Sequence, residues 1–159
     1  MTTSAPSPPD MANLKLLLVD DDAIALEEMG ETFEIEGWRH VTATSIEKAL
    51  DMLEADEDIR VVVTDVNFVD PNGKAANGIQ FVSRAKARFP DRPLSYLVFS
   101  GDPEAWKASV QVGVLTFLCK PFLAHELVEA VEKAVARGAH DTERASETVD
   151  VGSGMAESA

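Results

Sequence analysis

The stretch Val61–Asp65 constrains the fold of this chain more than any other, because an unbroken run of β-branched apolar residues ends there in a carboxylate. Three valines stand in a row, followed by Thr64 and Asp65. A strand can lack polar alternation only when both of its faces are covered. In parallel α/β sheets, ligands bind at the carboxyl ends of such strands. The run therefore predicts a buried strand that presents Asp65 at the edge of the sheet where sites form.

The remainder of the chain alternates between short apolar runs and segments with helical spacing. The predicted strands are Leu14–Val19, Arg39–Ala43, Ile59–Thr64, Leu94–Phe99 and Val114–Cys119. The predicted helices are Ala23–Ile35, a segment from Thr44 to about Ala55, Ile79–Phe89, Pro103–Val112 and Leu123–Arg137. Strand and helix thus alternate five times. This order predicts an α/β fold, with one parallel sheet, helices on both of its faces and right-handed crossovers.

Local signals place the ends of several elements. Asp22 is a predicted N-cap, and Thr44 with Glu47 three residues later forms a capping-box pattern. The connection 66–77 is long for a strand-to-helix link and contains the turn signals Asn72-Gly73 and Asn77-Gly78. We interpret it as a long loop, either functional or a tolerated surface insertion.

Composition separates the two ends of the chain from its centre. Residues 1–13 are rich in Ser, Thr and Pro, and residues 138–159 are rich in Gly, Ser, Ala, Thr and acidic side chains. Both lack periodic apolar positions, so they predict a disordered N-terminal segment and a disordered acidic tail. The ordered part is a single predicted domain over residues 14–137.

Charge and cysteine content exclude several classes of function. The formal net charge is −14, and so acidic a surface is repelled by a phosphate backbone, which argues against direct nucleic-acid binding. No run is long and apolar enough for a membrane helix, and no secretory signal begins the sequence, so we expect a cytoplasmic protein. The single cysteine, Cys119, excludes an intrachain disulfide; we interpret it as a small core residue, with a reactive thiol as the alternative.

Polar side chains follow four of the five predicted strands. Asp20-Asp21 ends the first strand, Asp65 the third, Ser100 the fourth and Lys120 the fifth. Clustered carboxylates repel one another unless a cation neutralises them, and hard oxygen ligands suit Mg²⁺. A carboxylate can also act as a nucleophile toward phosphorus, with lysine and metal compensating the charge of the transferring group. Any one of these residues has an ordinary explanation, but their coincidence at one sheet edge predicts a phosphoryl-transfer site.

These motifs resemble the receiver domain of bacterial two-component response regulators. The resemblance is carried, in this order, by Val19-Asp20-Asp21-Asp22, Thr64-Asp65, Phe99-Ser100-Gly101 and Lys120-Pro121-Phe122. It covers roughly Leu14 to Arg137. It implies a flavodoxin-like, doubly wound, five-stranded parallel sheet with strand order 2-1-3-4-5.

The same resemblance implies roles for individual residues. Asp65 is implied as the phosphoacceptor, supplied by a sensor histidine kinase or a histidine phosphotransfer protein. Mg²⁺ or Mn²⁺ is implied at Asp21, Asp65 and the backbone carbonyl of Asn67, with Asp20 in the same metal site. Further implied features are the switch hydroxyl of Ser100, the phosphate-pairing Lys120, the aromatic switch Phe117, the residues Asn67 and Asp102 that tune dephosphorylation, and a cis peptide bond between Lys120 and Pro121.

The sequence departs from the family pattern at three places. Phe68-Val69 stands where the family usually has Met-Pro, and Asn77-Gly78 comes about five residues late. The segment from Ser100 to Phe117 is slightly short, so we expect a short or distorted fourth helix. Leu123 follows Lys-Pro-Phe, which leaves the last helix without a good N-cap.

The leading hypothesis is a stand-alone receiver, monomeric or dimerising on phosphorylation, that signals by protein contact or acts as a phosphate sink. It would not be an enzyme beyond self-catalysed phosphotransfer and autodephosphorylation. One alternative is a phosphorylation-independent binding module. A less favoured one is a haloacid-dehalogenase-type phosphatase, because Asp20-Asp21-Asp22 resembles its nucleophile motif. In a phosphatase of this type Asp65 would have no role. The acidic residues after Lys120 would also lie on a helix, whereas that family needs an acidic pair near the end of a strand.

Overall fold

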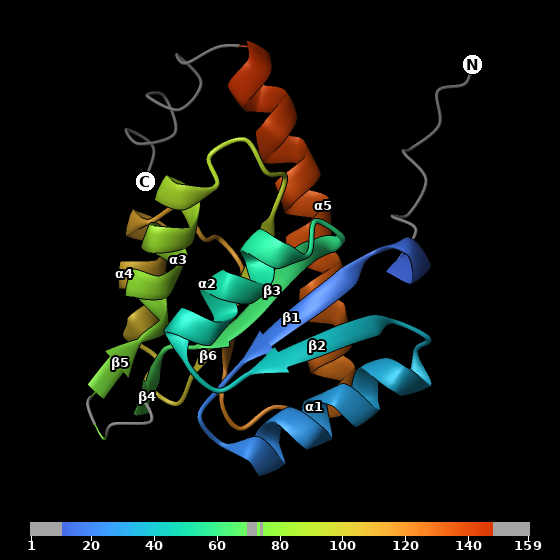
Figure 1. Cartoon of the computed structure of the whole chain (residues 1–159), viewed down its shortest axis with the longest axis vertical. Helices are drawn as coiled ribbons and strands as arrows, with labels where there is room; N and C mark the ends of the chain where they lie inside the picture. The colour runs from blue at the N-terminus through green and yellow to red at the C-terminus, as the bar shows by residue number, and fades with distance from the viewer. Residues whose placement is uncertain (1–10, 70–72, 74, 148–159) are drawn as a thin grey trace.

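The computed structural model describes residues 11–69, 73 and 75–147. Its main sheet contains the strands β1 (Lys15–Val19), β2 (Arg39–Ala43), β3 (Ile59–Asp65), β6 (Ser95–Ser100) and β7 (Phe117–Cys119). All neighbours pair in parallel, in the order β2-β1-β3-β6-β7. Since β6 and β7 are the fourth and fifth strands of this sheet, the predicted doubly wound order is confirmed. Figure 1 shows β2, β1 and β3 side by side.

Helices cover both faces of the sheet. They are α1 (Ala23–Ile35), α2 (Ile46–Ala55), α3 (Gly78–Arg88), α4 (Ala105–Gln111) and α5 (Ala124–Glu147). Successive strand side chains point to opposite faces. Leu16 and Leu18 accordingly join the apolar cluster under α1 and α5, whereas Leu17 and Val19 join the cluster under α2 and α3. The covered strand predicted from the three valines is therefore confirmed, since β3 contributes to both clusters.

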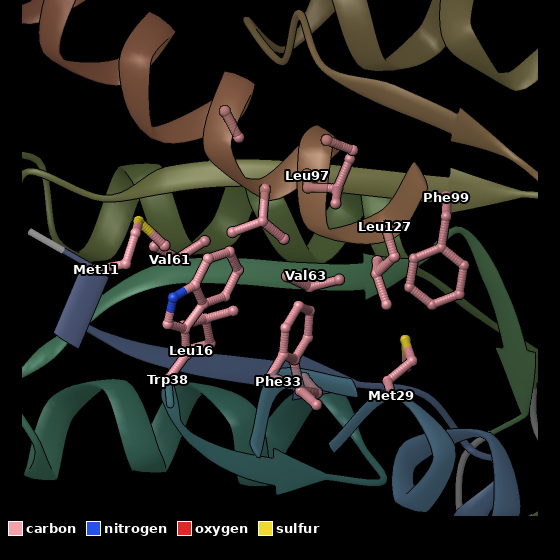
Figure 2. Close-up of a cluster of buried hydrophobic side chains, with 14 of the residues drawn as sticks. Met11, Leu16, Met29, Phe33, Trp38, Val61, Val63, Leu97, Phe99 and Leu127 are labelled. Atoms are coloured by element: carbon pink, nitrogen blue, oxygen red, sulfur yellow. The ribbon is translucent and has the colours of Figure 1, made fainter. Parts of the chain in front are cut away.

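The cluster under α1 and α5 is closed by aromatic and sulfur-containing side chains (Figure 2). Phe33 and Trp38 stack with their ring centroids 5.6 Å apart. Met11 is buried in the same cluster and belongs to a short 3₁₀ helix, Met11–Asn13. These three residues therefore form a helix where the sequence predicted disorder, held by the buried Met11 side chain and by a hydrogen bond from Arg39 to the Asn13 carbonyl oxygen. Residues 1–10 of that segment lie outside the described part of the chain.

The connection after β3 is not a plain loop. It forms an antiparallel hairpin of β4 (Asn67–Val69) and β5 (Ala75–Asn77), with Phe68 opposite Ala76 and Val69 opposite Ala75. Phe68 is buried in the cluster under α2 and α3 and anchors the hairpin there. A three-residue strand such as Ala-Ala-Asn has neither apolar alternation nor β-branching, so the sequence pattern did not predict it.

The helix ends agree with the predictions in part. Asp22 caps α1 as predicted, its Oδ1 accepting from the amides of Ile24 and Ala25. The cap of α2 is Ser45 rather than Thr44, since Ser45 Oγ accepts from the amide of Lys48 at 3.1 Å. α4 is short, as predicted, with seven residues; its N-cap residue, Glu104, makes no side-chain capping bond.

α5 continues ten residues past its predicted end at Arg137. Gly138 does not terminate it. A glycine that ends a helix usually has a positive φ angle, and among the described glycines this is found at positions 37, 73 and 113 and not at 138. A Cβ at Gly138 would lie 2.3 Å from Ser95 Oγ, so this glycine lies in close contact with β6 and does not form a turn. The prediction of disorder is wrong through Glu147; residues 148–159 lie outside the described part.

The exposure of Cys119 and the character of the helices bear on two further predictions. Cys119 is exposed, so its interpretation as a core residue is wrong; it ends β7, which has β6 as its partner and forms an edge of the sheet. None of the helices within the described ranges is long and apolar enough to cross a membrane.

Arg92 joins the far ends of α2 and β3 to the turn after α3. Its guanidinium donates to the carbonyl oxygens of Leu53, Asp56 (3.1 Å) and Ile59 (2.9 Å). These carbonyls end α2 and begin β3, where neither element supplies all of its own hydrogen-bond partners. Arg92 therefore fixes the start of the central strand.

Arg92→Ala is expected to lower the free energy of unfolding by roughly 1–3 kcal/mol, because part-buried carbonyls lose their donors. Urea unfolding followed by circular dichroism measures the change. Arg88→Ala is the matched control: it removes an exposed ion pair with Glu54, worth less than about 1 kcal/mol. Equal losses in the two variants would contradict this role of Arg92.

Candidate functional site

Three carboxylates meet at the carboxyl end of the sheet. Asp20 and Asp21 directly follow β1, and Asp65 closes β3, which pairs with β1 so that Val19 lies beside Thr64. One carboxylate oxygen of each residue lies within 4.8 Å of those of the other two. Asp20 and Asp65 are buried, whereas Asp21 is exposed. The structure thus brings together the acidic residues that the sequence singled out.

Asp20 is the most deeply buried of the three. Its Oδ1 accepts from the amide of Asp22 at 3.0 Å, but its buried Oδ2 has no hydrogen-bond partner among the described residues. The pKa of Asp20 is raised from its ordinary value of 3.8 to about 6, chiefly by burial and also by the charge of Asp65, while the Asp22 amide opposes the rise. An ionised, unpartnered oxygen in this position is suited to a bound cation.

Lys120 supplies the positive charge at the site. Its Nζ lies 3.2 Å from Asp65 Oδ2 and 5.1 Å from the centroid of the Phe99 ring. The amide of Lys120 donates to the Ser100 carbonyl oxygen at 2.9 Å, which holds the end of β7 beside the end of β6. The peptide bond between Lys120 and Pro121 is cis, as the family resemblance implies.

Ser100 and Asp102 form the turn that leads from β6 toward α4. Ser100 is buried. It directly follows Phe99, which pairs with Asp65 in the sheet. Its Oγ accepts from the amide of Asp102 at 3.0 Å, and Asp102 Oδ1 accepts from the amide of Glu104 at 3.0 Å. The carboxylate of Asp102 is thus committed to its own turn in this conformation.

Phe117 lies on β7 opposite Val98 and is half-buried. It packs against the apolar cluster between α3 and α4 that contains Val66 and Val114. The ring of Phe117 therefore lies beside α3 and α4, on the strand that leads to Lys120.

Gly78 allows α3 to begin immediately behind the phosphoacceptor candidate. A Cβ at this position would lie 2.0 Å from the backbone oxygen of Asp65 and 3.0 Å from Thr64 Oγ1. The amide of Gly78 also donates to the carbonyl oxygen of Val66 at 2.7 Å. A close approach of two backbones, and not a special φ angle, requires glycine here.

The hairpin contributes amides that the sequence did not reveal. The amide of Val69 donates to Asp21 Oδ2 at 2.9 Å, and that of Asn67 donates to Asp65 Oδ1 at 3.4 Å. Backbone donors leave no residue-type signal. The one available clue was the absence of proline at position 69.

The donor set fits a hard divalent cation. Three carboxylates with close oxygens are typical of Mg²⁺ or Mn²⁺ sites that keep room for water, and one of these oxygens, Asp20 Oδ2, has no hydrogen-bond partner among the residues that the structure describes. The backbone of Asn67 lies beside this cluster, because its amide approaches Asp65. Asp20, Asp21, Asp65 and the carbonyl of Asn67 are therefore the candidate ligands.

Gly78→Ala is expected to destabilise the protein by roughly 2–3 kcal/mol, because the new methyl group meets the Asp65 backbone. Helix propensity alone predicts a gain of up to about 1 kcal/mol, so the sign distinguishes the two effects. Urea unfolding measures it. Gly101→Ala is the control, since its Cβ would enter open space and should change little.

Asp20→Asn is expected to stabilise the metal-free protein by roughly 1–3 kcal/mol at pH 7–8, because it removes a buried charge whose folded pKa is raised to about 6. Below the ordinary pKa of 3.8 the aspartate is protonated in both states, and its penalty vanishes. The difference between variant and wild type should therefore grow from about pH 4 to about pH 6 and stay constant above. Urea unfolding with a chelator across this range measures it; a pH-independent difference would contradict the assignment.

Comparisons with known proteins agree with this geometry. The sequence model of the response regulator receiver domain matches residues 16–132. The chemotaxis protein CheY homolog of Campylobacter jejuni is 28% identical, over 79% of this chain and 95% of that protein. Response regulator protein FleR of Pseudomonas aeruginosa is 29% identical over 75% of this chain. The chain spans about a quarter of the length of FleR, 24%.

Solved structures show the same fold. The response regulator receiver domain protein (CheY-like) from Methanospirillum hungatei matches with a TM-score of 0.69 and 19% identity, over 80% of this chain and 98% of that one. The response regulator receiver protein from Pseudomonas putida matches with a TM-score of 0.66 and 28% identity, over 76% and 97%. With the family match extending over most of the ordered chain, this protein belongs to the response regulator receiver domain family.

Proposed function

We propose that this receiver accepts a phosphoryl group on Asp65 from the phosphohistidine of a sensor histidine kinase or of a histidine phosphotransfer protein. One observation carries the proposal: Asp65 Oδ2 lies 3.2 Å from Lys120 Nζ, beside two further carboxylates at the carboxyl end of the sheet. A carboxylate with a cation on one side and an acidic cluster on the other is suited to phosphoryl transfer.

The chemistry follows from these positions. A carboxylate oxygen of Asp65 attacks the phosphorus, a P–O bond forms, and the P–N bond to the donor imidazole breaks; the imidazole leaves as a neutral group after taking up a proton. Lys120 compensates the negative charge on the transferring oxygens. A Mg²⁺ ion held by Asp20, Asp21, Asp65 and the Asn67 carbonyl would supply further positive charge to those oxygens.

Ser100 and Phe117 are the proposed switch. The Ser100 hydroxyl, which now accepts from the amide of Asp102, has a proton to donate to a phosphoryl oxygen. Phe117 stands on the neighbouring strand against an apolar cluster and would follow the rearrangement of the β6 turn. Asn67 and Asp102 flank the site and are proposed to tune dephosphorylation.

Output is proposed to pass through protein contact, or the protein drains phosphate from a kinase. The C. jejuni CheY homolog, 95% of which is covered by its match to this chain, is named as a chemotaxis protein, whereas FleR is far longer. The net charge of −14 disfavours direct binding to nucleic acid. We propose a cytoplasmic protein, monomeric or dimerising on phosphorylation, without enzymatic activity beyond self-catalysed phosphotransfer and autodephosphorylation.

Incubation with phosphoramidate and Mg²⁺ is expected to add one phosphoryl group to the wild-type chain, detected as a single adduct by intact mass. Asp65→Asn should show no adduct, because it removes the nucleophile. Asp51→Asn, on the exposed face of α2, is the matched control and should be phosphorylated like wild type.

The time course of the adduct separates two outputs. Rapid decay fits a phosphate sink, whereas a long-lived adduct fits a switch. Wild-type protein that takes no phosphoryl group from phosphoramidate, acetyl phosphate or a histidine kinase would contradict the proposal. A phosphorylation-independent binding module would then be the better description.

A further inference from the structure

The free edge of β4 lies against the acidic cluster. Alternate amides of a strand point to opposite sides, so the amides of Asn67 and Val69 point the same way. Both are directed at carboxylates: Asn67 at Asp65 Oδ1, over 3.4 Å, and Val69 at Asp21 Oδ2, over 2.9 Å. The shorter of the two bonds joins residues that are 48 positions apart in the sequence.

The bond restricts the side-chain conformation of Asp21 more than it would restrict that of Asp20 or Asp65. Asp20 is buried and accepts from the Asp22 amide, and Asp65 is buried and pairs with Lys120. Asp21 is exposed, so its side chain would otherwise move among rotamers in solvent. A charge-assisted bond from a backbone amide selects one of them.

The position of the donor is fixed by the core. Phe68, the residue before Val69, is 4% exposed and packs into the cluster under α2 and α3. The side chain of Val69 is itself 48% exposed and adds little to packing. The buried Phe68 therefore fixes the place of the amide, while the exposed side chain of Val69 is replaceable.

We propose that the Val69 amide is a positioning group for the metal ligand Asp21, pre-orienting its carboxylate toward the cation that the proposed function requires. A carboxylate oxygen has capacity beyond one N–H donor, so the bond leaves room for metal coordination. A ligand that is already oriented loses less conformational freedom when the cation binds. The donor exists because valine stands where proline, which has no N–H, is usual in the family.

The test compares Mg²⁺ affinity among three full-length, unphosphorylated proteins by isothermal titration calorimetry. Val69→Pro removes the N–H, and the outward-facing edge of a strand is where proline is tolerated. Its dissociation constant for Mg²⁺ should rise three- to tenfold. Val69→Ala keeps the N–H and should stay within twofold of wild type. Equal affinities of the proline and alanine variants, or tighter binding by the proline variant, would overturn the inference; the latter would show that the amide competes with the cation.

A second measurement does not depend on the folding of the proline variant. Amide hydrogen exchange by NMR should show a protected Val69 amide in wild type, with protection lost in Asp21→Ala and kept in Asp102→Ala. Protection unchanged in Asp21→Ala would overturn the inference. If wild type binds no Mg²⁺, the proposed function fails, whereas the exchange experiment still reports the bond to Asp21.

Discussion

Repulsion among Asp20, Asp21 and Asp65 is the constraint on which this end of the molecule depends. Parallel strands bring their carboxyl ends to one edge, so the fold itself forces these charges together. The structure compensates with Lys120 beside Asp65 and with backbone amides donated to all three carboxylates. The compensation is incomplete, because one buried oxygen of Asp20 has no hydrogen-bond partner within the described part of the chain and the pKa of Asp20 is raised. The site is thus stabilised only in part without a cation.

Backbone contacts position the functional side chains of the site. Gly78 lets α3 start against the carbonyl of Asp65, and the Ser100 carbonyl accepts from the amide of Lys120. The hairpin places two more amides at the cluster. Behind them, the alternating side chains of β1 and β3 join apolar clusters on both faces, so the strands that carry the aspartates are fixed from either side.

Much of this could be predicted from the sequence, since burial and strand ends leave residue-type signals. The covered strand, the five-strand order, the Asp22 cap and the short α4 followed from apolar pattern, family resemblance and turn residues. What escaped prediction has no such signal. The hairpin depends on backbone pairing of Ala-Ala-Asn, and α5 passes Gly138 because that glycine packs against Ser95. Met11 and Cys119 were misjudged because burial of a single residue depends on its neighbours in space.

The length of α5 has a mechanical consequence. The helix begins four residues after Lys120 and continues unbroken to Glu147, past the sheet on which its first half packs (Figure 1). At 1.5 Å per residue its 24 residues form a rod about 36 Å long. A tilt of about 5° at the end near the acidic cluster would move the opposite end by about 3 Å, since displacement grows with distance along a rigid rod. Any tilt of the helix at one pole of the molecule would therefore become a larger displacement at the other pole.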